Sequence, residues 1–301
     1  MEAMDVSLAI TNHRKTPVFV YESSKRQYFA FPKFMMDYIR KNPNSWKLWK
    51  KLIQSCKWFF DKNPIVVISC LHYCRINGFS TCLTAQCTAV HDRRIKFTIA
   101  PFKLWITGLL EIVSTKSGAA AKCSNRVYKC ESMFLMFQLL TVDEFEFLTH
   151  DLSHLELFGT RILDKSKKLV SFENILERLP QLESITYNFM EDGRDVTPDT
   201  VKKIAKMEYG SKLHRIYLPD IPPTFDFDAF SNFMLENKQI SFELEFHDRS
   251  TTEEYMIKVK AFAEKLKTEN CDNHRRPEIF YNYNDLVNDT NGDENDIIND
   301  L

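Results

Sequence analysis

Short apolar segments recur at nearly regular intervals from the middle of the chain towards its C-terminal part. In residues 152–157, 182–187 and 213–218 the apolar side chains occupy the first, fourth and sixth positions. Side chains two residues apart lie on the same face of a strand, so each segment is predicted to be a strand with one buried face. Taking the last inward residue of each strand, the intervals are 22, 30, 31 and 28 residues, between Leu135, Leu157, Tyr187, Leu218 and Phe246.

Helical stretches separate these strands. Thr141 with Glu144 fits a capping box, which opens a short helix. The other predicted helices cover residues 171–179, 197–207, 226–237 and 251 to about 267, the last capped by Thr251 with Glu254. Strands and helices that alternate with this period are typical of leucine-rich repeats, in which each unit buries its apolar face only by stacking on the next. The periodicity leaves an irregular α/β domain open as the alternative.

The stretch before these units carries less regular signals. Residues 65–73 are β-branched and apolar, and residues 95–99 alternate in polarity, so both are predicted to be strands. Residues 102–113 are predicted to be helical, and residues 114–121 are predicted to form a loop. Together with the repeated units they give one predicted domain over residues 65–283.

The segment of residues 31–64 combines aromatic and basic residues at helical spacing. Pro32 suits the first position of a helix, and Asn42-Pro43 ends that helix. A second helical run from Ser45 places one apolar stripe opposite five lysines. The stripe consists of Trp49, Leu52, Ile53, Cys56 and Phe60. Two or three short helices cannot hide this much aromatic surface among themselves, so the segment needs a partner.

The order of landmarks in this segment resembles an F-box, with Phe31-Pro32 at its start and Cys56-Lys57 followed by aromatic residues near its end. More closely, it resembles the N-terminal box of a large family of nematode F-box proteins. It departs from the common F-box opening in having Phe31, and not leucine, before the proline. Residues 130–160 and 176–185 resemble the C-terminal region of the same family. The helix pattern alone leaves an ordinary helical cap without a partner as the alternative.

The resemblance implies a non-enzymatic substrate-recognition subunit of a Skp-cullin-F-box ubiquitin ligase. Its partners would be a Skp-type adaptor with the cullin complex and an unknown target protein. The predicted Skp-binding residues are Pro32, Met35, Leu48, Ile53 and Phe59. A ligase-independent scaffold or leucine-rich-repeat-like binding protein is the alternative.

Side-chain alternation predicts where a target would bind. Because the leucines of each strand point into the stack, the intervening side chains point to the other face of the sheet. They are Glu156 and Phe158, Thr186 and Asn188, Arg215 and Tyr217, and Glu243 and Glu245. Stacked repeats form an extended concave surface, and Arg and Tyr are enriched at interfaces. We therefore expect Arg215 and Tyr217 to contribute most to target binding.

Motifs for catalysis are missing from the sequence. It contains no phosphate-binding loop, dinucleotide fingerprint or G-x-S-x-G motif, and only 7 glycines. His150 and His154 are four residues apart, but that spacing covers about 13 Å along a strand, which is too far to share a metal ion. We therefore predict neither an enzyme nor a bound cofactor.

The cysteines raise the question of a zinc site. Cys70, Cys74, Cys82, Cys87 and His91 are close in sequence. Their spacing lacks the usual C-x2-C pairs, so buried free thiols are favoured over zinc, and no metal is predicted. The chain has 8 cysteines and no secretory signal segment, which favours reduced thiols in the cytoplasm or the nucleus.

Charge and composition complete the prediction. Residues 31–64 carry eight basic and two acidic residues, a local charge of +6. The aromatic residues lie on the apolar stripe and not beside the lysines, so they indicate a protein interface. The resemblance implies that the Skp-type adaptor is acidic, so docking to this adaptor is favoured over nucleic acid. No apolar run is long enough to predict a membrane span. The predicted α/β (α+β) chain has an N-terminal extension, a helical F-box-like module, an irregular leucine-rich-repeat-like strand–helix stack and a disordered acidic tail, over residues 1–27, 28–64, 65–283 and 284–301.

Overall fold

The computed structural model describes residues 31–82, 87, 93–97, 102–114, 118–190, 192–207, 212–246, 252–268 and 276–281. The predicted N-terminal extension and the predicted acidic tail lie outside these residues. Within them the chain has a mixed α/β fold with a large, mostly parallel sheet, which confirms the predicted fold class in its coarse form. None of the described helices is both long enough and apolar enough to cross a membrane.

The helices of the described part are α1 (Lys33–Lys41), α2 (Trp46–Ser55), α3 (Lys57–Lys62), α4 (Ala119–Ser124), α5 (Val142–Thr149), α6 (Phe172–Leu176), α7 (Thr200–Lys206), α8 (Phe227–Glu236) and α9 (Glu253–Thr268). The strands are β1 (Ile65–Ile68), β2 (Leu71–Cys74), β3 (Gly78–Thr81), β4 (Arg93–Arg94), β5 (Lys103–Val113), β6 (Val127–Met136), β7 (Leu139–Thr141), β8 (His154–Phe158), β9 (Arg161–Leu163), β10 (Ser184–Tyr187), β11 (Arg215–Leu218), β12 (Ser241–Glu245) and β13 (Glu278–Phe280).

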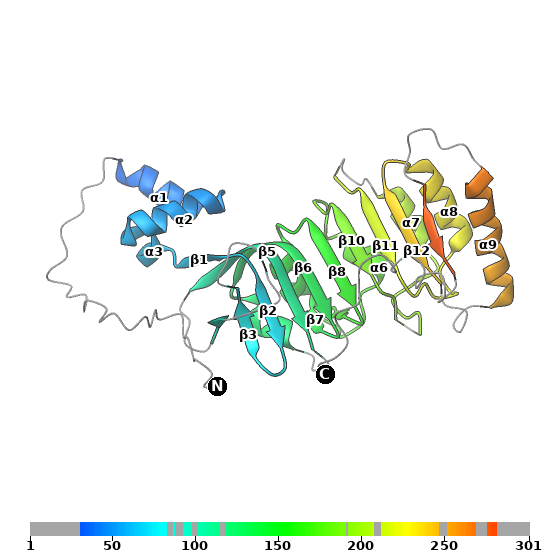
Figure 1. The fold of residues 1–301 in the computed structure, drawn as a ribbon, viewed down its shortest axis with the longest axis horizontal. Coiled ribbons are helices and arrows are strands. Elements are labelled where there is room, and N and C mark those ends of the chain that lie inside the picture. Colours follow the sequence, from blue (N-terminus) through cyan, green and yellow to red (C-terminus); the bar gives the residue numbers. More distant parts are fainter. Residues whose placement is uncertain are drawn as a thin grey trace.

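The large sheet has the strand order β13-β12-β11-β10-β8-β6-β5-β2-β3-β4, and β1 pairs with β5. β7 and β9 form a separate two-stranded sheet. The strands of the large sheet follow one another in a long row, with α1 to α3 at one end and α9 at the other (Figure 1).

From β6 to β12 the neighbouring strands of the large sheet are parallel, and at least one helix lies between successive strands along the chain. Leu135 pairs with Leu157, and Leu157 pairs with Tyr187. Three residues that the sequence spacing made equivalent are therefore neighbours in the sheet. Leu218 pairs with Leu244, so Leu244, and not Phe246, is the residue equivalent to Leu218. Phe246 lies two residues further along the chain, and the predicted interval from Leu218 to Phe246 is therefore wrong.

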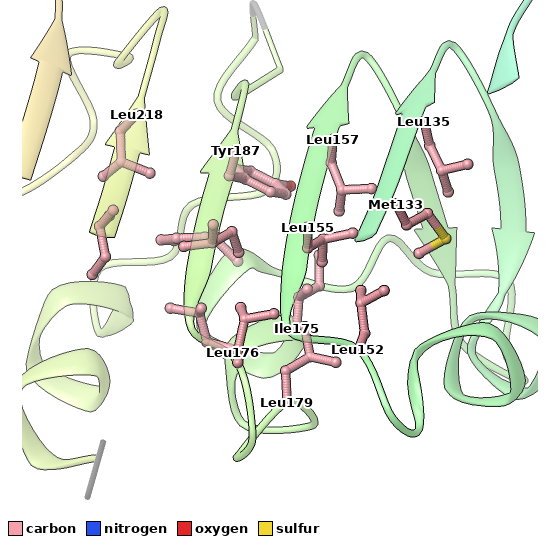
Figure 2. Packing of buried hydrophobic residues seen from close by; sticks show 14 of the residues in the cluster. Met133, Leu135, Leu152, Leu155, Leu157, Ile175, Leu176, Leu179, Tyr187 and Leu218 are labelled. Atoms are coloured by element: carbon pink, nitrogen blue, oxygen red, sulfur yellow. The ribbon is translucent and has the colours of Figure 1, made fainter. Parts of the chain in front are cut away.

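The main hydrophobic core lies between one face of this sheet and the helices. Leu155 and Leu157 of β8 point towards the side on which Ile175, Leu176 and Leu179 lie (Figure 2). All five side chains are buried. Burying one such side chain contributes about 1.5–3 kcal/mol relative to leaving it exposed, so each unit is stabilised mainly by contact with its neighbours.

Local signals fix where two of the helices begin. The Glu144 backbone N–H donates to Thr141 Oγ1 at 3.3 Å, and the Thr141 backbone N–H donates to Glu144 Oε2 at 2.8 Å, which confirms the predicted capping box. The predicted cap of the last helix, Thr251, lies outside the described residues. The next residue, Thr252, stands directly before α9, and its Oγ1 accepts the Tyr255 backbone N–H at 3.3 Å.

The predicted helix over residues 102–113 is wrong, because these residues form β5. Leu104 and Ile106 face the main core, while Trp105 between them packs elsewhere, as expected for alternation along a strand. β5 pairs with β1 and β2 on one edge and with β6 on the other. The spacing of apolar residues in a short stretch is compatible with a helix or with a strand. Here the residues form a strand because other strands pair with both of its edges. In the predicted loop over residues 114–121, residues 119–121 belong instead to α4.

The predicted single strand over residues 65–73 is two strands. β1 and β2 pair with consecutive parts of the same edge of β5, which carries one extra residue between them. Gly108 lies at this irregular point, where a Cβ atom would be 2.8 Å from the Ser69 carbonyl oxygen. Only glycine permits so close an approach. The predicted strand over residues 95–99 is not seen, since β4 ends before it and residues 98 and 99 are not described.

Residues 31–62 form three short helices, as the sequence predicts. Pro32 is the N-cap of α1 and not its first helical residue. Ser45 caps α2, its hydroxyl accepting the Leu48 backbone N–H at 3.4 Å. The predicted apolar stripe does not run on one helix, because the extended backbone of Cys56, with φ −146°, separates α2 from α3.

These three helices pack on the sheet through a second, smaller core. It consists of Met36, Trp49, Phe59, Ile65 and Trp105. Trp49 Nε1 donates to the Ile65 carbonyl oxygen at 3.0 Å, and the Tyr128 hydroxyl donates to the Pro43 carbonyl oxygen at 3.4 Å. Trp105 points to the sheet face that is opposite the main core, and it packs there against side chains of the three helices. The helices therefore cover one end of that second sheet face.

Candidate functional site

Along each strand, the residues between those that face the main core point to a second face of the sheet. Ile216 and Leu218 are 1% and 0% exposed, so Arg215 and Tyr217 point away from the core and the predicted register of β11 is confirmed. Strand pairing carries this register to β8, β10 and β12. We use the name polar sheet face for the side chains of Glu156, Phe158, Thr186, Arg215, Tyr217, Glu243 and Glu245.

A hydrogen-bond network joins β11 to β12 on the polar sheet face. Arg215 donates from Nε and Nη2 to the two carboxylate oxygens of Glu243, at 2.8 and 2.7 Å. The Tyr217 hydroxyl donates to Glu245 Oε2 at 2.8 Å. The guanidinium carbon of Arg215 lies 5.7 Å from the centre of the Tyr217 ring. The charge-assisted bidentate contact with Glu243 holds Arg215 in one orientation, and the hydrogen bond to Glu245 holds Tyr217.

The predicted target-binding residues differ in accessibility. Glu156 is exposed and Phe158 is half-buried. Thr186 is only 3% exposed, so its predicted exposure is wrong: the longer side chains of its strand neighbours Glu156 and Tyr217 flank it. Asn188 is half-buried and its side-chain amide donates to the Asp220 carboxylate.

Glu245 is also nearly covered, with 9% exposure. It accepts the Tyr217 hydroxyl, so it supports an accessible neighbour and is not itself an accessible contact residue. The accessible part of the polar sheet face therefore lies on Glu156, Phe158, Arg215, Tyr217 and Glu243.

Negative charge dominates this face, since it carries three glutamates and a single arginine. Loss of hydration raises the pKa of Glu156 above its ordinary value, Arg215 opposes this effect, and the charge of Glu111 adds to it. Burial and the hydrogen bond to Glu245 raise the pKa of Tyr217, so its hydroxyl remains a donor at neutral pH.

A second candidate surface lies on α1 and at the start of α2. Phe34 and Tyr38 are each 69% exposed, Leu48 is 50% exposed and Met35 is 44% exposed. Phe34 and Met35 lie four and three residues before Tyr38 on α1, so both are neighbours of Tyr38 on the helix surface. Tyr38 and Leu48 line the same pocket, together with Pro43. We name Phe34, Met35, Tyr38 and Leu48 the apolar box surface.

The predicted Skp-binding residues fall into two groups. Pro32, Met35 and Leu48 are exposed, and Ile53 is half-buried. Phe59 is 4% exposed and its ring centre lies 6.1 Å from that of Trp49, so it belongs to the smaller core and is not accessible to a partner. Phe34 and Tyr38 were missed, although their spacing with Met35 on a helix signals one shared face.

His150 and His154 do not come together as metal ligands. His150 Nε2 lies 3.1 Å from Asp151 Oδ2, and His154 Nδ1 lies 3.0 Å from Ser184 Oγ on the adjacent strand. One group of potential metal ligands is found within the described residues, and it contains neither histidine.

That group brings Cys70, Cys82 and Cys87 together with His72, which the sequence reasoning missed. The signal for His72 was its position two residues after Cys70, on the same strand face. Cys74 is exposed and lies outside the group, and His91 is not described. Cys70 and Cys82 are buried as predicted, but Cys87 is exposed.

Comparisons with known proteins add no identification. A scan of protein-family models finds none that matches the chain, and a search of curated proteins finds no match.

Proposed function

We propose that this chain is the substrate-recognition adaptor subunit of a Skp-cullin-F-box ubiquitin ligase. In this proposal α1 to α3 are an F-box-like module and the following strands and helices are an irregular leucine-rich-repeat-like stack. The resemblance of residues 31–64, 130–160 and 176–185 to nematode F-box proteins supports it. A helical module with one exposed apolar surface, followed by an extended sheet face, suits a protein that joins one constant partner to one specific target.

The apolar box surface is the observation that carries the proposal. Its four large side chains are exposed although the helices already contribute Trp49 and Phe59 to the smaller core. Neighbouring exposed apolar side chains of this size mark protein contact sites, and interface energy concentrates in a few of them. The same helices expose Lys33, Lys47 and Lys50, and positive charge there would accelerate association with an acidic adaptor.

Binding of the full-length chain to a purified Skp adaptor tests the proposal. Leu48→Asp places a charge on the apolar box surface without touching either core, because Leu48 is half-exposed. If Leu48 is an anchor residue, the dissociation constant should rise about tenfold or more. Ile257→Asp is the matched control, because Ile257 is a large apolar residue on α9 with 62% exposure.

Three outcomes separate the alternatives. Loss of binding in Leu48→Asp, with unchanged binding in Ile257→Asp, supports the adaptor role. Equal binding by both variants means that the apolar box surface is not the docking site. If the unmodified chain does not bind the adaptor, the ligase-independent scaffold becomes the better explanation of the same two surfaces.

The polar sheet face is the proposed contact for the target protein. Arg215 and Tyr217 are fixed by Glu243 and Glu245, so binding would cost little side-chain ordering. The glutamates that surround them favour a target segment carrying basic residues. In this role the chain would act in the cytoplasm or the nucleus, where its cysteines stay reduced.

A further inference from the structure

One side-chain cluster at the N-terminal edge of the sheet belongs to neither binding surface. Cys70 lies between β1 and β2, His72 is in β2, Cys82 follows β3, and Cys87 comes five residues later. The three sulfur atoms and one ring nitrogen of His72 all lie within 4.8 Å of one another. We name these four residues the Cys/His cluster.

The strand geometry explains why these side chains meet. Leu71 points into the main core, so Cys70 and His72 on either side of it point to the opposite face. β2 and β3 are antiparallel, with His72 opposite Ser80. Cys82, two residues after Ser80, therefore lies beside Cys70, and its backbone N–H donates to Cys70 Sγ at 3.5 Å.

The distances suit a tetrahedral metal site. Cys82 Sγ and Cys87 Sγ are 3.8 Å apart, and two sulfur atoms bound to one zinc ion at about 2.3 Å are separated by about 3.8 Å. His72 Nε2 lies 3.0 Å from Cys87 Sγ. These two atoms would separate by only about half an ångström to share a zinc ion with tetrahedral angles.

Glu111 on β5 supplies the outer contact that such a histidine needs. Its Oε2 lies 2.6 Å from His72 Nδ1, the ring nitrogen that does not face the cluster. When Nδ1–H donates to this carboxylate, the lone pair of Nε2 points at the cluster. Carboxylate–histidine contacts of this kind fix the tautomer and the ring orientation of metal-bound histidines.

We propose that the Cys/His cluster binds one zinc ion through three thiolates and one imidazole. Thiolate and imidazole are the ligands that zinc prefers, and four protein ligands leave no open position, so the site is structural. On binding, the three thiol protons pass to solvent and no electron is transferred. The ion joins the β2–β3 hairpin, the segment carrying Cys87 and, through Glu111, the central strand β5. The site is independent of the adaptor role.

Metal binding to the reduced full-length chain tests this proposal. The chain should contain about one zinc ion, and Co²⁺ in its place should give the thiolate charge-transfer and tetrahedral ligand-field absorption of a Cys3His site. Cys87→Ser should lose these signals, and it should fold because Cys87 is exposed. Cys74→Ser is the matched control, since Cys74 is an exposed cysteine of the same hairpin outside the cluster.

Glu111→Gln tests the outer contact. It leaves all four ligands in place and should weaken Zn²⁺ affinity about 10–100-fold, whereas loss of fold would change the circular-dichroism spectrum as well. A reduced chain that binds neither Zn²⁺ nor Co²⁺ overturns the proposal. Equal metal content in Cys87→Ser and Cys74→Ser also overturns it. A Cys82–Cys87 disulfide in the purified chain, found by mass spectrometry before and after reduction, would replace the metal site by a redox pair.

Discussion

The two halves of the large sheet are built differently. In the regular half, from β8 to β12, parallel strands of four or five residues keep one register. In the irregular half, from β1 to β6, β5 has 11 residues and β6 has 10, and their pairing contains register shifts. This half also contains an antiparallel pair, β2 with β3, near the β4 edge of the sheet. The regular half can therefore repeat one packing solution, and the irregular half cannot.

The difference shows in what stabilises each half. In the regular half, rings pack against rings: the ring centre of Phe230 lies 5.0 Å from that of Phe225 and 5.9 Å from that of Phe242. The irregular half also has ring contacts, since the ring centre of Phe79 lies 4.7 Å from those of Tyr73 and Phe97. Its strands depend in addition on single contacts without a repeat, among them the close approach at Gly108 and the Trp49–Ile65 hydrogen bond. When one such contact is lost, no equivalent contact on a neighbouring strand compensates for it.

Phe230→Ala should cause the largest loss of stability. Phe230 is 0% exposed, and truncating a buried phenylalanine costs about 3–5 kcal/mol because a cavity remains. The measurement is urea-induced unfolding of the full chain. Phe147→Ala, which truncates a phenylalanine with 42% exposure, is the control and should change the free energy of unfolding by less than about 1 kcal/mol. Equal losses would mean that ring packing does not dominate the regular half.

Gly108→Ala should destabilise the irregular half by about 1–3 kcal/mol, because the added methyl group forces the Ser69 backbone to move. Hydrogen exchange should show lower protection in β1 and β2, while protection in β10 and β11 stays unchanged. Uniform loss of protection across the sheet would show that the two halves unfold as one unit.

The regular half was predictable because each of its signals is local. The alternation at Ile216 and Leu218 gave the register of β11, and Thr141 with Glu144 gave the start of α5. These features depend on residues a few positions apart, so the sequence contains them directly.

The irregular half was not predictable in this way. Residues 103–113 form a strand because three other strands pair with them. No local sequence pattern predicts those pairings. The Cys/His cluster depends on the same long-range geometry: a hairpin register brings Cys82 beside Cys70, and β5 places Glu111 against His72. The polar sheet face was found correctly in direction, but the burial of Thr186 depends on side chains of two other strands.

Glu173→Gln tests a polar contact in the regular half and should cost about 1–2 kcal/mol at neutral pH, because the amide replaces only part of the hydrogen bonding. Glu173 is 0% exposed and accepts from Thr200 Oγ1 at 2.7 Å and from Thr197 Oγ1 at 3.2 Å. Burial alone would raise its pKa, but the hydrogen bonds outweigh burial and lower the pKa below the ordinary value of 4.5.

The sign of the pH dependence follows from that lowered pKa. The stabilisation is fully present above the unfolded pKa, near 4.5, and is lost as the pH falls through the folded pKa. The stability difference between the unmodified chain and Glu173→Gln should therefore shrink in acid. Glu146→Gln, at an exposed carboxylate, is the control and should show almost no difference at any pH. A difference that does not depend on pH would contradict the lowered pKa.

Replacing Arg215 and Tyr217 together by Ala should have the smallest effect on stability, about 1 kcal/mol or less, because both side chains are partly solvated and lie outside the main core. Its effect on target binding should be large if the polar sheet face is the recognition surface. Proximity labelling of partners compares this double variant with a control, Lys258→Ala, whose ion pair with Asp228 lies on the helical side of the regular half. Loss of labelled partners only in the double variant would assign recognition to the polar sheet face. An unchanged set of partners would place target binding elsewhere, and the Arg215–Glu243 pair would then serve only to join β11 to β12.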